Sequence, residues 1–396
     1  MPASTSTSDA LPAKRPTLSA PASPAREFYI DRLRVVMTAL VILHHTSITY
    51  GAPGGWFWTE LTPSGTPTSI LFTLFVSTNQ AYFMGFFFLL AGYFTPRSLE
   101  KKGYARFIGD RFMRLGLPLL AFGLLLGPLT AAIVTYAEGN GFWSTWAWLW
   151  RHHRFINGPL WFAQALLIFS LGYCAWRAAV GSPLSESERH EKPIPRGLWW
   201  LLSALGVAAG ALVLRQFFPV GKNFFGLQLA YFSSYTFLFA VGIAAWRNDW
   251  LRQLTWQQAR PWVLRLGIAW SALPLGILLI RWATGIQNQN TSTGISWASV
   301  LYALWEPFVA WGLIAAWLLL FRNHMNRPSI FWEWLGRRAY AVYIIHPPVL
   351  VGIALLLYPW IAPALLKFAV VGTLAPIATW LIADPLVRLP GVRQIV

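Results

Sequence analysis

An apolar run, RLRVVMTALVILHH at residues 32–45, ends in two histidines. Arg34 and His45 are eleven positions apart, about three helical turns, so both project from one face with His45 about 16 Å further along the axis. An imidazole exchanges protons near neutral pH, as a general base must. His44 is rotated by about 100° onto an apolar face. Because polar groups facing lipid are costly, we expect the Arg34 face to point inward, which favours His45. The alternative is a structural histidine, hydrogen-bonded to a neighbouring helix.

Two more titratable residues lie within apolar runs and precede proline. Glu306, in LYALWEPFVAW, is the only carboxylate well inside such a run. Carboxylates of this kind usually have a partner or face a cavity, so Glu306 is expected either to serve a site or to pair with Arg281 or Lys367. His346 precedes two prolines, which free backbone carbonyls and kink a helix. We expect His346 either to assist proton transfer or to be structural.

The composition identifies the class of protein that carries these residues. Of 396 residues, 56% are hydrophobic and only 11% are charged, whereas soluble proteins carry about 25% charged residues. The chain is therefore predicted to be an all-α, polytopic membrane protein embedded in a lipid bilayer. The net charge of +17 falls in short clusters between apolar runs, which argues against a nucleic-acid-binding surface. Cys174 is the only cysteine, which excludes an intramolecular disulfide.

About ten transmembrane helices are expected, because a span needs roughly 20 apolar residues. Residues 1–26, rich in Ser, Pro, Ala and Thr, are predicted to be a disordered tail, and residues 27–396 to form the transmembrane domain. The expected spans are 33–50, 70–95, 113–135, 158–177, 198–216, 225–246, 263–282, 298–321, 339–357 and 361–382.

The distribution of Lys and Arg predicts the orientation of these spans. With both termini in the cytoplasm, all but six of the 31 basic residues fall on the cytoplasmic side. Several tryptophans, Trp56 and Trp58 among them, lie near predicted span ends, as interfacial belts require.

Five stretches, in order, resemble the membrane-bound acyltransferase 3 family over about residues 27–396. They include the Arg34–His45 spacing, a second span leading to the Arg111-x-x-Arg114 pair, and a late span with a histidine before proline. A glucan-biosynthesis branch is the most similar. The chain departs from the family in two places: the family often has Ser at the position of Ala91, and some members have Glu near the position of Gln164. The further stretches are FFFLLAGYFTPRSLEKKGYARFIGDRFMRLGLPLL (86–120), GPLWFAQALLIFS (158–170), AYAVYIIHPPVLV (339–351) and RLPGVRQIV (388–396).

The resemblance implies transfer of an acyl group from cytoplasmic acyl-CoA to a hydroxyl of a glycan or other acceptor, in the inner membrane of a bacterium. Acyl-CoA would be a donor substrate, with no permanently bound cofactor. Arg34, Arg111 and Arg114 would hold its phosphates, although positive-inside topology alone explains the last two equally well. The catalytic candidates are His45, Arg34, Glu306 and His346. His45 would act either as general base or as a transiently acylated relay.

Two other functions fit parts of the pattern. Proline-interrupted spans with an intramembrane carboxylate and histidines also suit a proton-coupled transporter of a small polar solute. However, the two halves of the chain show no matching hydropathy. A regulator that has lost catalysis is the third possibility. The RHHR cluster at residues 151–154 lacks further ligands at suitable spacing, so no metal site is expected.

Overall fold

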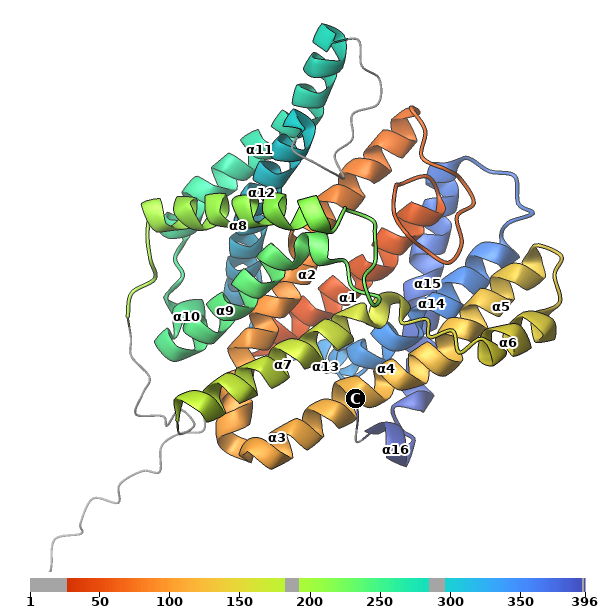
Figure 1. The fold of residues 1–396 in the computed structure, drawn as a ribbon, viewed down its shortest axis with the longest axis horizontal. Coiled ribbons are helices and arrows are strands. Elements are labelled where there is room, and N and C mark those ends of the chain that lie inside the picture. Colours follow the sequence, from red (N-terminus) through yellow and green to blue (C-terminus); the bar gives the residue numbers. More distant parts are fainter. Residues whose placement is uncertain (1–26, 182–191, 285–295, 394, 396) are drawn as a thin grey trace, which may run out of the picture.

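The computed structural model describes residues 27–181, 192–284, 296–393 and 395 (Figure 1). The predicted disordered tail, residues 1–26, lies outside them. Within them the regular elements are helices, α, and short 3-10 or π-helical segments, η. They are α1 (Phe28–Thr49), α2 (Pro67–Lys102), α3 (Tyr104–Arg111), η1 (Phe112–Gly116), α4 (Leu117–Ala121), η2 (Phe122–Leu126), α5 (Gly127–Ala137), α6 (Phe142–Arg151), η3 (Gly158–Leu160), α7 (Trp161–Val180), α8 (Leu198–Phe217), η5 (Leu229–Tyr231), α9 (Phe232–Asn248), α10 (Trp250–Gln253), α11 (Trp256–Thr284), α12 (Trp297–His324), α13 (Ile330–Gly336), α14 (Ala339–Leu356), α15 (Ala364–Leu386) and α16 (Pro390–Arg393).

The all-α, polytopic class is confirmed. Among the described residues, eight helices are long and apolar enough to cross a membrane. They correspond to eight of the ten expected spans. The first and seventh expected spans are the long helices α1 and α11. One aspartate, two arginines, two histidines, three threonines and one serine lower the mean hydropathy of α1. That polar content is the feature that marked α1 as a candidate site.

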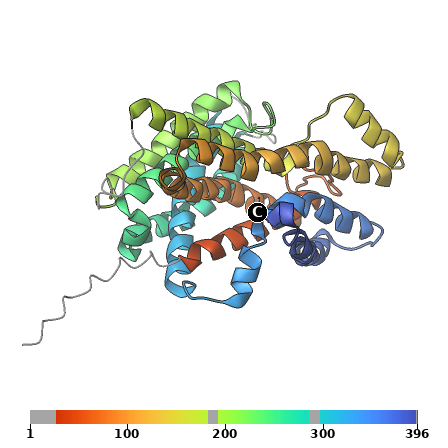
Figure 2. The same ribbon diagram turned by 90° about the horizontal axis from the view of Figure 1, so that it is seen from below.

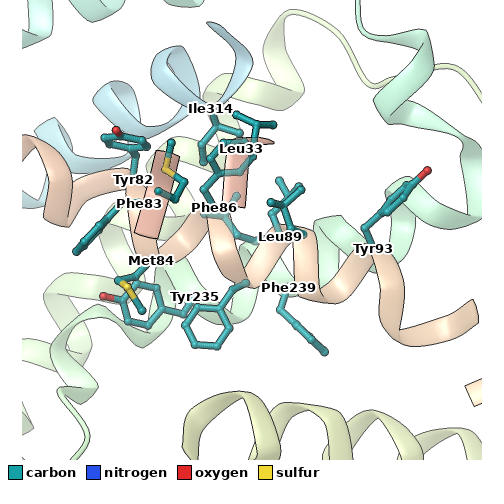
Figure 3. Packing of buried hydrophobic residues seen from close by; sticks show 14 of the residues in the cluster. Leu33, Tyr82, Phe83, Met84, Phe86, Leu89, Tyr93, Tyr235, Phe239 and Ile314 are labelled. Carbon is teal, nitrogen blue, oxygen red and sulfur yellow. The ribbon is translucent and has the colours of Figure 1, made fainter. Parts of the chain in front are cut away.

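The core is built around α2, which packs along α9 and also contacts α1 and α12. Figure 3 shows Leu33 of α1, Phe86 and Leu89 of α2, Phe239 of α9 and Ile314 of α12 in one buried cluster. Every side chain in this group is at most 6% exposed. The apolar face of α1 therefore packs against α2, and the opposite face is left for α14.

The third span is a nearly continuous rod from α3 to α5, interrupted by the π-helical segments η1 and η2 (Figures 1 and 2). Pro118 has no N–H to offer the carbonyl of Arg114, four residues earlier. The Tyr340 hydroxyl of α14 donates to that carbonyl at 2.5 Å. The proline thus creates a hydrogen-bond acceptor through which α14 contacts the third span.

Helices α2 and α9 approach closely because glycines face each other. A Cβ on Gly242 would lie 2.1 Å from the carbonyl oxygen of Leu89, which is backbone and cannot rotate away. We therefore expect Gly242→Ala to lower stability by about 1–3 kcal/mol, the usual cost of overpacking. Thermal unfolding in detergent measures this. Gly172→Ala on α7, where a Cβ meets open space, is the matched control. Equal melting temperatures for the two variants would contradict the packing described.

Candidate active site

His45 and His346 lie side by side although 301 positions separate them in the chain. Helices α1 and α14 pack together, and the Nδ1 atom of His45 is 3.2 Å from the Nε2 atom of His346. The two rings are nearly parallel, at 12°, with centroids 5.3 Å apart. His346 is fully buried and His45 is partly exposed. His45 is therefore the more accessible member of the pair.

The carbonyl of Tyr343 fixes the orientation of His346. In a regular helix this carbonyl would accept from the N–H of residue 347, but that residue is Pro347 and has no N–H. The Nδ1 atom of His346 lies 2.8 Å from the freed oxygen. A carbonyl oxygen only accepts hydrogen bonds, so Nδ1 of His346 is the donor.

This contact assigns the tautomers of both neutral rings through the hydrogen-bond network. Since His346 carries its proton on Nδ1, its Nε2 atom is an acceptor. His45 must then donate from Nδ1, which leaves the lone pair of its own Nε2 free. A histidine held in this way presents a base to a substrate, as the oriented histidine of a catalytic triad does.

Trp56 covers one face of the pair. It belongs to the connection between α1 and α2, and its ring stacks on His45 at 3.9 Å and 10°. The ring is also parallel to that of His346, at 5.9 Å and 8°. The position of Trp56 near a predicted span end had indicated an interfacial belt. No periodic pattern relates a connecting segment to a helix face, so the sequence alone does not predict this contact.

His44 occupies a different environment from His45. Its ring stacks on Phe83 of α2 at 5.1 Å, and the side chain is 6% exposed. Its contacts agree with the apolar face expected for it. Although the two histidines are adjacent in the chain, His44 thus packs in the core of the bundle and His45 lies at the candidate site.

The three candidate donor-binding arginines lie near the start of α1 and along the third span. Arg34 is 3.6 Å from Asp31 and lies over the ring of Phe94 of α2. Arg111 donates to Ser98 of α2 at 3.0 Å. Arg114 pairs with Asp110 at 3.1 Å, and half of its side chain is exposed. Contacts with α2 therefore bring Arg34 and Arg111 to the same end of that helix.

Glu306 is separate from the histidine pair. Its carboxylate binds the guanidinium of Arg215 of α8 at 2.5 Å, and the Arg215 side chain is 1% exposed. The rings of Tyr231 and Tyr302 flank that guanidinium. The expected pairing of Glu306 with Lys367 is wrong, because Lys367 binds Glu60 instead.

The other expected partner of Glu306, Arg281, has a side chain that lies outside the described part of the structure. Arg215 was missed because it stands at the end of a span, where a basic residue is ordinary. Only the folded packing of α8 against α12 shows that its side chain turns inward.

We expect Glu306→Gln to destabilise the protein by about 3–5 kcal/mol, because it leaves the buried Arg215 charge without its counter-ion. The double variant Arg215→Met, Glu306→Gln should recover part of this loss, since both charges are then gone. Thermal unfolding of the single and double variants in detergent is the measurement. If Glu306→Gln melted like the unchanged protein, the ion pair would have no structural role.

The chain matches known proteins over most of its length. The profile of the acyltransferase 3 family, described as an acyltransferase domain, matches residues 27–384. The chain is also similar to "Glucans biosynthesis protein C" of Salmonella heidelberg (strain SL476), with 22% identity over 87% of each chain. The proteins of that name from Salmonella agona (strain SL483) and Salmonella enteritidis PT4 (strain P125109) match with the same identity and coverage. No solved structure matches. On this evidence, and on its multi-span helical architecture, the chain belongs to the acyltransferase 3 family.

Proposed function

We propose that this protein is an O-acyltransferase of a bacterial inner membrane. It takes an acyl group from acyl-CoA at the cytoplasmic face and transfers it to a hydroxyl of a carbohydrate or other acceptor on the opposite side. The observation that carries the proposal is the His346–His45 hydrogen bond, which leaves Nε2 of His45 free to act as a base. Family membership supplies the reaction class.

In the direct route, the acceptor hydroxyl gives its proton to Nε2 of His45 as its oxygen attacks the thioester carbonyl carbon. The C–O bond forms, the C–S bond breaks, and the imidazolium returns the proton to the departing CoA thiolate. In the relay route, Nε2 itself attacks the thioester carbonyl, the C–S bond breaks and CoA leaves as its thiolate. The acceptor hydroxyl then attacks the acyl-imidazolium, which frees Nε2, and the hydroxyl proton passes to the thiolate. Both routes need the same lone pair, which the tautomer of His346 leaves free.

The donor's polar end would bind at the start of α1. Phosphates do not enter hydrocarbon, and Arg34 is a guanidinium with 42% of its side chain exposed at that end. A cavity of about 170 Å³ lies at the same end of α1, lined by Asp31, Arg32 and Trp332 among others, but not by Arg34 itself. Arg34 and His45 share one helix face, so the neutral pantetheine arm would follow α1 inward.

We expect His45→Ala to abolish the release of free thiol from acyl-CoA, because the base is lost. The loss should be at least about 100-fold, the lower end of what a general base contributes. His346→Ala should reduce the rate less, because His45 remains but loses its fixed tautomer. The measurement is thiol release by purified protein in detergent, with a glycan acceptor present.

His44→Leu is the matched control. It replaces the adjacent histidine, which stacks on Phe83, meets His45 only edge-on at 5.5 Å and takes no part in the His45–His346 hydrogen bond, and should leave turnover within about threefold. Full turnover in a folded His45→Ala variant would refute the site assignment. No thiol release from the unchanged protein, with transport of a small solute into vesicles, would favour the transporter instead.

Replacing Arg34 should weaken the binding of acyl-CoA and leave the rate of the acyl-transfer step unchanged. We expect Arg34→Gln to raise KM for acyl-CoA about tenfold with little change in kcat, because a charge-assisted bond of about 1.5 kcal/mol or more is lost. Arg106→Gln, which alters an exposed arginine of α3, is the control for general loss of positive charge. Equal effects of the two variants would leave Arg34 with a topological role only.

A further inference from the structure

Trp56 is placed to act on the charge of His45. Its ring lies 3.9 Å from that of His45 and within 10° of parallel, so the indole presents its face to the imidazole. Face stacking leaves the ring edge of His45 free, and the Nε2 lone pair lies in that edge. Trp56 can therefore stay in place while a proton arrives at Nε2.

The connection that carries Trp56 is fastened to the helices at both ends. Ser69 Oγ donates to the carbonyl of Gly51 at 2.6 Å. Beyond Trp56, the carboxylate of Glu60 binds Lys367 of α15 at 2.5 Å, and both side chains are less than 10% exposed. The indole N–H makes no hydrogen bond within the described residues. Stacking and these anchors therefore position the ring.

The histidine pair is charged during the proposed reaction. When Nε2 of His45 accepts a proton, an imidazolium forms deep in the bundle, where water gives it little solvation. In a serine-protease triad a carboxylate stabilises this cation. Among the described residues, His45 forms no ion pair with a carboxylate; its contacts are with His346, His44 and Trp56. The electron-rich face of an indole is the strongest aromatic partner for a cation.

We propose that Trp56 is a positioning residue of the acyl transfer, which stabilises the imidazolium form of His45 through its π face. The inference rests on the proposed function. In this proposal the connection between α1 and α2, and not a helix, supplies the group that stabilises the imidazolium. On this view Trp56 raises kcat and makes no contribution to donor binding.

The first test compares Trp56→Leu with Trp56→Phe by thiol release. Leucine keeps apolar bulk without a π face, so kcat should fall about tenfold with an unchanged KM for acyl-CoA. Phenylalanine should restore most of the loss. Trp58→Leu, which alters the same connection at a ring that contacts Tyr358 and neither histidine of the pair, is the control and should keep kcat within about twofold.

A second test separates π stabilisation from packing. The protein is produced in cells grown on fluorinated tryptophans. Each fluorine withdraws electron density from the face of every indole with little change in the size of the ring. We expect kcat to fall stepwise with each added fluorine in the unchanged protein and to stay constant in the Trp56→Phe background. Equal slopes in the two backgrounds would overturn the proposal.

Another outcome would also overturn it. If Trp56→Leu matched or exceeded the unchanged protein in kcat, Trp56 would be only a cover over the site. A protein that releases no thiol in any form would instead refute the proposed acyl transfer. The two failures are therefore distinguishable.

Discussion

A missing N–H group at Pro347 determines the state of the candidate site. Because the proline cannot satisfy the carbonyl of Tyr343, that oxygen accepts from His346 at 2.8 Å instead. His346 then accepts from His45, and the order of donors and acceptors leaves a lone pair on Nε2 of His45. A buried carbonyl without a partner would cost about 1–3 kcal/mol. The Tyr343 carbonyl, which would otherwise lack a hydrogen-bond donor, thus orients His346 and, through it, the base His45.

The rest of the fold maintains this arrangement. The Tyr340 hydroxyl attaches α14 to the third span at the carbonyl that Pro118 leaves free. The close glycine contact between α2 and α9 builds the core against which the apolar face of α1 packs. The Arg215–Glu306 pair joins α8 to α12 in the interior. Prolines and glycines, which weaken isolated helices, serve here as points where helices meet.

Hydropathy and periodicity predicted much of this structure. The apolar runs have the length of spans, and the spacing from Arg34 to His45 distinguishes the histidine that meets His346 from its neighbour that stacks on Phe83. The partner of His45 was foreseeable only in part. The proline after His346 indicated a freed carbonyl, but not that α14 would lie against α1.

Contacts made by connecting segments and span ends were not predictable in this way. Trp56 stands in an irregular stretch, and Arg215 resembles any basic residue at the end of a span. Their positions depend on packing between segments far apart in the chain, such as the anchoring of Glu60 by Lys367. Local pattern carries no information about which distant helix a side chain will meet, so these residues emerge only from the folded chain.

The most direct measurement of the central claim is the protonation of each imidazole nitrogen by 15N NMR of histidine-labelled protein at neutral pH. His45→Asn and His346→Asn variants would assign the two signals. We predict a proton on Nδ1 of both rings and an unprotonated Nε2 on His45. A signal showing His45 protonated on Nε2 and bare on Nδ1 would contradict it, because the proposed base would then have no lone pair to offer.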